Sequence, residues 1–281
     1  MPRSCSKEKG EAMLSEGTFE GKVAIVTGGG SGLGRGMALE FARLGASVVV
    51  GGRRAEPLEE TVAQIEDDGG VGHAKPTDVR DPDQVDALVE DAVKRFGRVD
   101  VLVNNAAGNF VVKAEDLSPN GWRAVVGIVL DGGFLCARAA GRRMIEQGDG
   151  GAILSVLASY AWTGGPGTVH SASAKAGLLA MTRTLAVEWA PHGIRVNCIC
   201  PGPTETEGAG AALWPTDEQR ASVAATVPLG RLGTVEEVAW WSAALCSRYA
   251  DWITGEVVTI DGGHWLEQEA YIGALRDAPR S

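Results

Sequence analysis

The sequence is poor in the residue types that build covalent or metal-bound frameworks. Its 281 residues include only five cysteines, four histidines and three tyrosines. The cysteines show no paired pattern of spacings, so they predict no disulfide scaffold and indicate a reducing compartment. The histidines lie singly along the chain, without the spacing of metal ligands, and we expect no metal site.

Long apolar runs and an excess of positive charge are also missing. No uninterrupted apolar stretch approaches the about 18 residues of a membrane span, and the N-terminal segment lacks the apolar core of a signal peptide. We expect a cytoplasmic protein with no membrane span and with a flexible tail over residues 1–19. The net charge of −10 argues against a nucleic-acid partner, because backbone phosphates need a basic face.

Short β-branched runs alternate with longer helical patterns, which is typical of a parallel sheet flanked by helices. The predicted strands are residues 22–27, 47–51, 71–75, 99–104, 151–156, 194–199 and 256–260. The predicted helices are residues 33–44, 57–67, 82–96, 119–147, 168–190, 216–226 and 235–246. We therefore predict one α/β domain over residues 20–281, a doubly wound, Rossmann-like fold with a seven-stranded, mostly parallel sheet.

The glycine-rich stretch VTGGGSGLGRG (26–36) follows the first predicted strand and opens a helix. Gly28, Gly32 and Gly34 allow a tight turn and a close approach of the backbone to a pyrophosphate at the positive end of that helix. A turn without a ligand is the alternative. Glycines placed between a strand and a helix are more specific than glycine spacing alone, so the stretch predicts a dinucleotide site.

The end of the second predicted strand indicates which dinucleotide binds. An NAD site would place an acid there for the ribose hydroxyls, whereas this chain has Gly51 and Gly52 followed by Arg53 and Arg54. Two guanidinium groups suit a 2′-phosphate, so NADP(H) is favoured over NAD. Asp78, just past the third strand, has two interpretations: it contacts the adenine amino group, or it is the N-cap of the next helix.

Four motifs resemble those of the short-chain dehydrogenase/reductase family: TGGGSGLG, NNAAG (104–108), SASAKAG (171–177) and PGP (201–203), in order between about residues 20 and 263. The ordinary alcohol and ketone reductases of that family use an asparagine, a serine, a tyrosine and a lysine. The matching positions here hold Val129, Leu157–Ala158, Ser171 and Lys175. Since only the lysine is kept, the resemblance excludes an ordinary alcohol dehydrogenase.

Within the family, the chain is similar to the NADPH-dependent 2,4-dienoyl-CoA reductases of fatty-acid β-oxidation, especially the mitochondrial type. The stretches that carry this likeness are NNAAGNF (104–110), LSPNGW (117–122), SASAKAG and GRLGTVEEVA (230–239). That branch has its tyrosine eleven residues before the serine of SxxxK, where this chain has Tyr160, and its asparagine matches Asn109. The resemblance implies that both contact the substrate, together with Phe110 and Ser118; a core aromatic is the alternative for Tyr160.

The resemblance also implies the chemistry, the reduction of a 2,4-dienoyl-CoA to a 3-enoyl-CoA. Hydride from NADPH would attack the far end of the dienoyl thioester, so that negative charge develops on the thioester oxygen. Tyr160 and Asn109 would donate hydrogen bonds to that oxygen, each worth roughly 3 kcal/mol. Lys175, one helical turn from Ser171, would hold the nicotinamide ribose. Ser171 either bridges to the substrate or a water, or is a passive small residue.

The resemblance sets the expected cofactor site, oligomer and partners. The predicted cofactor-binding residues are Gly28, Ser31, Gly32, Leu33, Gly34, Arg53, Asp78, Asn105, Lys175, Pro201 and Gly202. The family implies a homotetramer built on the two long helices at 119–147 and 168–190. The expected substrate is an acyl thioester linked to coenzyme A.

One loop departs from the branch's pattern. After PGP the chain carries Glu205 and Glu207 and no cation, where the dienoyl-CoA reductases have basic residues for the coenzyme A phosphates, and carboxylates would repel these phosphates. Either the phosphates bind at Arg53, Arg54 or Lys113, or the acyl carrier differs. Two other functions stay open: a reductase of another enoyl or carbonyl compound, and a non-enzymatic NADPH-binding protein.

Overall fold

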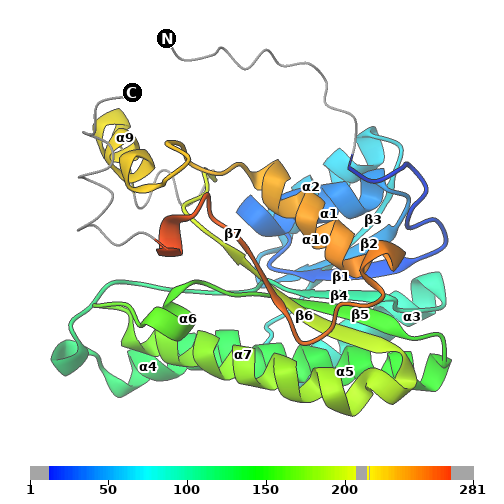
Figure 1. Cartoon of the computed structure of the whole chain (residues 1–281). Helices are drawn as coiled ribbons and strands as arrows, with labels where there is room; N and C mark the ends of the chain where they lie inside the picture. Colours follow the sequence, from blue (N-terminus) through cyan, green and yellow to red (C-terminus); the bar gives the residue numbers. More distant parts are fainter. Residues whose placement is uncertain (1–12, 207–213, 215, 267–281) are drawn as a thin grey trace, which may run out of the picture.

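The computed structural model describes residues 13–206, 214 and 216–266, and it contains one seven-stranded sheet with strand order β3-β2-β1-β4-β5-β6-β7 (Figure 1). Every strand pair is parallel, so the predicted fold class is confirmed, with an all-parallel sheet. The strands are β1 (Val23–Thr27), β2 (Ser47–Gly52), β3 (Val71–Pro76), β4 (Val101–Asn104), β5 (Gly151–Val156), β6 (Ile194–Pro201) and β7 (Val257–Ile260).

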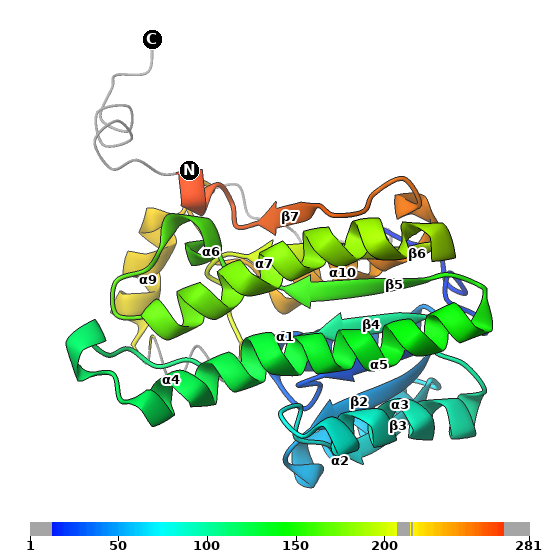
Figure 2. The same ribbon diagram turned by 90° about the horizontal axis from the view of Figure 1, so that it is seen from below.

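Helices cover both faces of the sheet (Figures 1 and 2). One core layer packs α1 (Gly32–Arg43), α2 (Ala55–Asp67) and α10 (Val235–Cys246) on the sheet. The other packs α3 (Pro82–Phe96), α5 (Gly132–Gln147) and α7 (Val169–Trp189) on the opposite face. This burial on both sides explains why β1, β2 and β4 read as almost continuous apolar runs.

The long helical segment predicted at 119–147 is one continuous run with a change of winding in its middle. It comprises α4 (Pro119–Val126), a π-helical turn η2 (Gly127–Asp131) and α5. Among the described residues this run alone is long and apolar enough to cross a membrane by length and composition, with half of its most apolar window buried inside the domain. Core helices pass the same test, and α5 packs here on the sheet.

The N-terminal boundary of the packed region lies earlier than the sequence suggested. Leu14 and Phe19 are buried in the core layer of α1, and the Phe19 ring meets the Phe41 ring edge-on at 5.1 Å between centroids. Phe19 also donates its backbone N–H to the Leu44 carbonyl. The segment that follows residue 12 is thus packed on the domain rather than being part of a free tail.

The order of the strands places the functional end of the molecule. The chain runs outward from β1 to β3 and then returns to start β4 on the other side of β1. In open parallel sheets ligands bind beyond the carboxyl ends of the strands at such a switch point. The glycine-rich turn after β1 and the NNAAG segment after β4 both lie there. Shorter helices complete the described part: η1 (Ala114–Asp116), α6 (Tyr160–Thr163), η3 (Ala190–His192), α9 (Asp217–Thr226), η4 (Arg248–Ala250) and η5 (His264–Leu266).

Candidate active site

The turn between β1 and α1 has the backbone that the glycines predicted. Gly28 and Gly32 adopt φ of +66° and +52°, a region that favours glycine. A Cβ on Gly34 would lie 2.1 Å from the Gly28 carbonyl oxygen, so the helix can approach the turn only without a side chain there. Ser31 is the N-cap of α1 but its side chain makes no capping hydrogen bond. The positive end of α1 therefore opens toward this turn, as an anion site requires.

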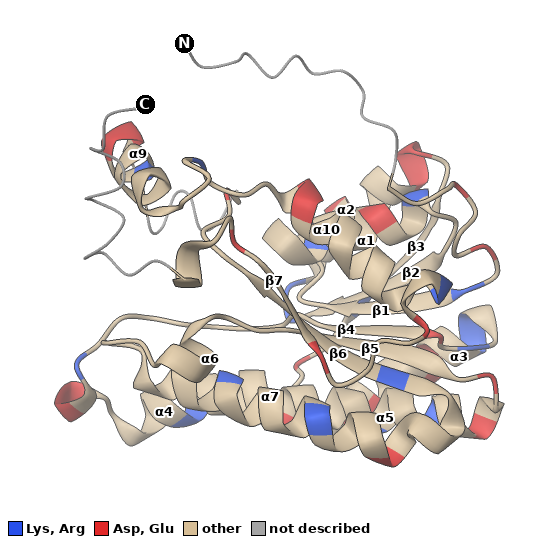
Figure 3. Ribbon diagram, in the orientation of Figure 1, with Lys and Arg blue, Asp and Glu red and all other residues tan. Residues whose placement is uncertain are grey.

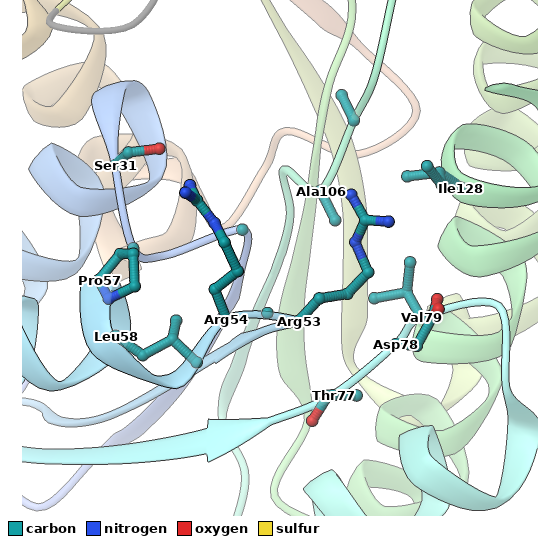
Figure 4. A pocket seen from close by; sticks show the side chains of 14 residues that line it. Ser31, Arg53, Arg54, Pro57, Leu58, Thr77, Asp78, Val79, Ala106 and Ile128 are labelled. Atoms are coloured by element: carbon teal, nitrogen blue, oxygen red, sulfur yellow. The ribbon is translucent and has the colours of Figure 1, made fainter. Parts of the chain in front are cut away.

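A pocket beside this turn is lined by Gly28, Gly30, Ser31, Gly52, Arg53, Arg54, Pro57, Leu58, Thr77, Asp78, Val79, Ala106, Ala107 and Ile128. Figure 4 shows the Arg53 and Arg54 side chains extending into it from the end of β2. Both arginines are exposed, so their charges are available to a ligand. The sequence singled out Gly28, Ser31, Arg53, Arg54 and Asp78, and the pocket contains all of them.

The Asp78 carboxylate accepts hydrogen bonds from a neighbouring arginine and does not cap a helix. The Arg80 guanidinium donates to both of its carboxylate oxygens, with an Nε–Oδ1 distance of 2.9 Å, and these hydrogen bonds lower the pKa of Asp78 to about 2. The N-cap of α3 is Asp81, whose carboxylate accepts the backbone N–H groups of Asp83 and Gln84. The N-cap interpretation of Asp78 was therefore wrong, and its contact with an adenine stays a prediction.

Asn105 holds the glycine-rich turn between β1 and α1. Its side-chain amide donates to the carbonyl oxygens of Thr27 at 3.0 Å and Gly28 at 3.2 Å. The Thr27 hydroxyl in turn accepts the backbone N–H groups of Asn105 and Ala106. These bonds tie the end of β4 to the end of β1. The residues of this segment that reach the pocket are Ala106 and Ala107, so the amide of Asn105 acts here by positioning the turn.

Several pocket residues were missed by the sequence reading. Thr77, Val79 and Ile128 line the pocket although no motif marks them. Thr77 and Val79 flank Asp78, so the one sequence feature that could have predicted them is their position just past the end of a predicted strand. Ile128 lies in the π-helical turn η2, and nothing in the local sequence pattern indicated that it would line this pocket. Pro201 and Gly202 lie at the end of β6, where a Cβ on Gly202 would meet Asp261.

The structure brings Tyr160 and Ser171 together. Tyr160 is the first residue of the short helix α6, and Ser171 lies in the first turn of α7. Their hydroxyl oxygens are 3.1 Å apart, within hydrogen-bond distance. Ser171 is buried and Tyr160 half-buried, so the phenol is not a core aromatic. A tyrosine hydroxyl therefore lies beside the position where the ordinary family reductases carry their own tyrosine.

Lys175 lies one turn below Ser171 on the same face of α7, and it is buried. Its ammonium group donates to the Val156 carbonyl oxygen at the end of β5. Burial lowers the pKa of Lys175 to about 8, partly offset by the nearby Cys198 and Cys200. The lysine is thus fixed beneath the hydroxyl pair, in an environment that does not favour its charge.

Asn109 and Phe110 follow β4 on an exposed loop. The Asn109 side-chain oxygen accepts the backbone N–H of Phe110 at 2.9 Å. This bond assigns the amide orientation, because the acceptor must be the oxygen, and it leaves the amide N–H groups directed elsewhere. The loop lies against the segment before α7, since the backbone N–H of Val112 donates to the Gly167 carbonyl at 3.0 Å. The Asn109 amide is therefore available as a hydrogen-bond donor near the N-terminal end of α7.

The other positions of the family quartet carry no polar group. Val129 and Leu157 are both 3% exposed and belong to one apolar cluster with Leu178. Ser118, predicted to contact the substrate, is the N-cap of α4, and its hydroxyl accepts the Gly121 backbone N–H at 3.0 Å. In the described residues Ser118 therefore has a structural role, and a substrate contact remains a prediction.

The charged residues considered for coenzyme A lie on different elements. Glu205 donates its backbone N–H to the Gly233 carbonyl, Lys113 is exposed at the start of η1, and Glu207 lies outside the described residues. In Figure 3 lysines and arginines are interspersed with acids over the described helices. Arg53 and Arg54 line the pocket beside the glycine-rich turn, which leaves Lys113 as the candidate on the side of Asn109.

Comparison with known proteins identifies the family. Residues 28–264 match the family model described as enoyl-(acyl carrier protein) reductase. The chain is 50% identical over 249 residues to a Bacillus subtilis protein named probable 2,4-dienoyl-CoA reductase, (2E)-enoyl-CoA-producing, covering 88% of this chain and 98% of that one. It is 41% identical to the Caenorhabditis elegans probable 2,4-dienoyl-CoA reductase 3, (3E)-enoyl-CoA-producing, covering 89% of this chain and 82% of that one.

Solved structures agree with this result. A short-chain dehydrogenase from Bacillus anthracis superposes with a TM-score of 0.82 at 49% identity, covering 89% of this chain and 99% of that one. A structure from Beutenbergia cavernae that holds NADP at low occupancy superposes with a TM-score of 0.83 at 34% identity, covering 90% of this chain and 100% of that one. The chain belongs to the short-chain dehydrogenase/reductase family and is an oxidoreductase with a fold that binds a nicotinamide cofactor.

Proposed function

We propose that this protein is an NADPH-dependent 2,4-dienoyl-CoA reductase that acts in the β-oxidation of unsaturated fatty acids in the cytoplasm. The observation that carries the proposal is the displaced tyrosine. Tyr160 lies within hydrogen-bond distance of Ser171, whereas the ordinary asparagine and serine positions hold the buried apolar residues Val129 and Leu157. An enzyme that delivers a proton to a ketone oxygen beside the hydride acceptor needs those polar groups, and this chain lacks them.

The dinucleotide fits the residues present at the cofactor end of the sheet. When bound, NADPH supplies the hydride. Arg53 and Arg54 would hold its 2′-phosphate, and the open N-terminus of α1 would hold its pyrophosphate. Lys175 would hold the nicotinamide ribose and keep positive potential near the reacting thioester. Lys113 is the proposed cation for the coenzyme A phosphates.

The substrate end needs hydrogen-bond donors at the thioester oxygen. Hydride adds to C5 of the dienoyl chain, so electron density moves through the conjugated bonds to that oxygen. Tyr160 would donate its phenol proton in a hydrogen bond and Asn109 an amide N–H, the group left unused by its own side-chain contact. Such donors stabilise a developing oxyanion, and losing one typically costs on the order of 10² to 10³ in kcat.

Protonation of the resulting dienolate decides the product. A proton delivered to C2 leaves the double bond between C3 and C4, and a proton delivered to C4 leaves it between C2 and C3. The hydroxyls of Tyr160 and Ser171 lie together, at the proposed thioester end, where C2 is the adjacent carbon. This arrangement supports protonation at C2 and a 3-enoyl product.

A second candidate keeps the same hydride step but gives a 2-enoyl product. It is favoured by the name of the Bacillus subtilis relative, which specifies a (2E)-enoyl product, whereas the names of the Caenorhabditis elegans and Danio rerio relatives specify a (3E)-enoyl product. Both candidates use the same residues at the thioester oxygen and differ only in the carbon that receives the proton.

A substrate panel tests the proposal. NADPH oxidation would be followed with a 2,4-dienoyl-CoA, a 2-enoyl-CoA, a 3-ketoacyl-CoA and a simple ketone. We expect turnover with the dienoyl-CoA and at least about 10²-fold lower kcat/KM with the others. The two carbonyl compounds take hydride at the carbon that carries the charged oxygen, and the 2-enoyl-CoA takes it at C3, two carbons closer to the thioester oxygen than C5 of the dienoyl chain. Comparable turnover of the ketone would overturn the proposal, and NADPH binding without turnover of any compound would favour a non-enzymatic role.

A further inference from the structure

His170 is a fully buried side chain that the proposed mechanism does not use. It is 0% exposed, and neither ring nitrogen has a hydrogen-bond partner among the residues that the structure describes. A buried polar group without a partner costs about 1–3 kcal/mol relative to a satisfied one. An apolar side chain would fill this position without that cost, so the imidazole is expected to find its partner in another state of the protein.

His170 is linked to each proposed oxyanion donor through one intervening residue. It precedes Ser171, whose hydroxyl pairs with Tyr160, in the first turn of α7. Its ring packs on the Phe110 ring at 4.5 Å between centroids, and Phe110 follows Asn109 in the chain. A molecule held by Tyr160 and Asn109 would therefore have its next polar group close to His170.

Phe110 lies between His170 and the solvent. Phe110 is 43% exposed while His170 is fully buried, so the phenyl ring forms the outer side of the pair. It belongs to the loop after β4, where the described chain forms no helix or strand between Asn104 and Ala114. A rotation of this side chain would uncover the face of the imidazole on which the phenyl ring packs.

The chemistry of an acyl thioester leaves few partners for the imidazole. The acyl chain is hydrocarbon, and the two lone pairs of the thioester oxygen are used by the proposed donors Tyr160 and Asn109. The next polar group is the first amide of the coenzyme A arm, two methylene groups from the sulfur. A neutral imidazole carries one donor and one acceptor, which match an amide carbonyl or an amide N–H.

We propose that His170 is a substrate-binding residue that hydrogen-bonds the first amide of the thioester arm once Phe110 turns aside. This inference rests on the proposed function. It gives the site a means of selecting thioesters that carry an amide at this distance, and it places the arm so that the thioester oxygen faces Tyr160 and Asn109.

The test compares His170→Leu with the wild type on three dienoyl thioesters: the coenzyme A ester, the N-acetylcysteamine ester, which keeps the first amide, and the S-pentyl ester, which has a similar length and no amide. We expect His170→Leu to lower kcat/KM about 10-fold for the first two and less than 2-fold for the third, because only an amide can lose the hydrogen bond. His170→Gln, which keeps a donor and an acceptor, should restore most of the activity.

Equal losses on all three thioesters would overturn the inference, because they would mean that His170 acts through packing or binds an internal water. A wild type that turns over none of the three, although it binds NADPH, would instead overturn the proposed function and this inference with it. The covering role of Phe110 is tested by diethyl pyrocarbonate. Phe110→Ala should have one more reactive histidine than the wild type, and the Phe110→Ala/His170→Leu double variant should not have it. An unchanged number of reactive histidines in Phe110→Ala would show that Phe110 does not cover His170.

Discussion

At the scale of single residues, Arg53 offers the clearest test of cofactor choice. Arg53→Asp replaces an attractive contact to a 2′-phosphate by a repulsive one, so we expect NADPH affinity to fall by at least about 2 kcal/mol with NADH affinity nearly unchanged. Titration of both coenzymes by fluorescence measures this. Arg95→Asp, an equal charge change at an exposed position on α3, is the control, and equal losses of both coenzymes would show that Arg53 is structural.

Lys175 should show opposite effects on activity and on stability. Its pKa falls from 10.5 in the unfolded chain to about 8 in the fold, so burying the ammonium costs about 3 kcal/mol at neutral pH. Lys175→Met removes that cost and also the bond to the Val156 carbonyl, which is worth about 1 kcal/mol. We expect the variant to be inactive, to bind NADPH weakly, and to be more stable by about 2 kcal/mol near pH 7.

The pH dependence of this difference has a definite sign. Between about pH 8 and 10.5 the unfolded chain holds the lysine proton and the folded chain has lost it. The free energy of unfolding of the wild type therefore rises with pH across this window. The stability difference by which the wild type falls below Lys175→Met should shrink as the pH approaches 10.5. Urea unfolding of both proteins across that range measures it. A constant difference would show that the lysine is charged in the fold throughout the window.

The residues of the site differ in how far the sequence predicted them. The glycines between a strand and a helix predicted a tight turn beside a phosphate, and the arginines at a strand end predicted a phosphate contact. The structure places Gly28, Arg53 and Arg54 around one pocket. Asp78 was ambiguous because the stretch DVRDPD offers three acids. Asp81 is the one that caps α3, because Pro82 occupies the first turn and proline favours that position. His170 carried no motif, and only its burial marks it.

At the scale of elements, the close contact between the turn after β1 and helix α1 should tolerate no side chain. Gly34→Ala would place a Cβ 2.1 Å from the Gly28 carbonyl oxygen and 2.5 Å from the Asn105 amide nitrogen. We expect a loss of about 2 kcal/mol or more in stability and a large loss of NADPH affinity, because backbone must shift to make room. Thermal unfolding and NADPH titration measure both effects.

Gly127→Ala is the matched control for this substitution. Gly127 lies in the π-helical turn with a helical φ of −61°, and its added Cβ would meet only the Arg80 side chain at 3.7 Å. This variant should be as stable as the wild type or slightly more stable, since alanine has the higher helix propensity. If Gly34→Ala behaved like this control, the tight approach of α1 to the turn would be disproved.

The sequence pattern predicted most helices and strands but not two short changes of backbone conformation. Buried strands such as β1 and β5 read as short apolar runs, and α3 and α10 have clear caps, so their places were predictable. The π-helical turn Gly127–Asp131 was not predicted, because its winding interrupts a run whose apolar pattern continues through it. The four-residue helix α6 was also missed, since one turn leaves no periodicity to read.

At the scale of the whole molecule, we predict a homotetramer in which α5 and α7 pair with their copies across a two-fold axis. The two helices lie side by side on one face of the domain (Figure 2). Phe134 on α5 is 47% exposed and Val187 on α7 is 77% exposed, which suits a surface covered by a partner. Light scattering should give four times the chain mass of 29.2 kDa.

Charge placed on this surface should break the assembly. Phe134→Glu/Val187→Glu should shift the protein to dimers or monomers, because burying two unpaired carboxylates per chain is unfavourable. Val71→Glu introduces one charge at a position that is 50% exposed on the edge strand β3, away from both helices, and should leave the mass unchanged. A wild type that is monomeric at micromolar concentration would contradict the prediction.

The proposed mechanism depends on Tyr160 and on the carbons that receive the hydride and the proton. The direct measurement uses NADPH carrying deuterium at the transferred position with a 2,4-dienoyl-CoA in water, and unlabelled NADPH in deuterium oxide, with products located by NMR. The proposed mechanism predicts deuterium from NADPH at C5 and solvent deuterium at C2 of a 3-enoyl product. It also predicts a kcat about 10² to 10³ lower for Tyr160→Phe with NADPH binding retained. Deuterium from NADPH on a carbonyl carbon, or dienoyl turnover that survives Tyr160→Phe intact, would contradict it.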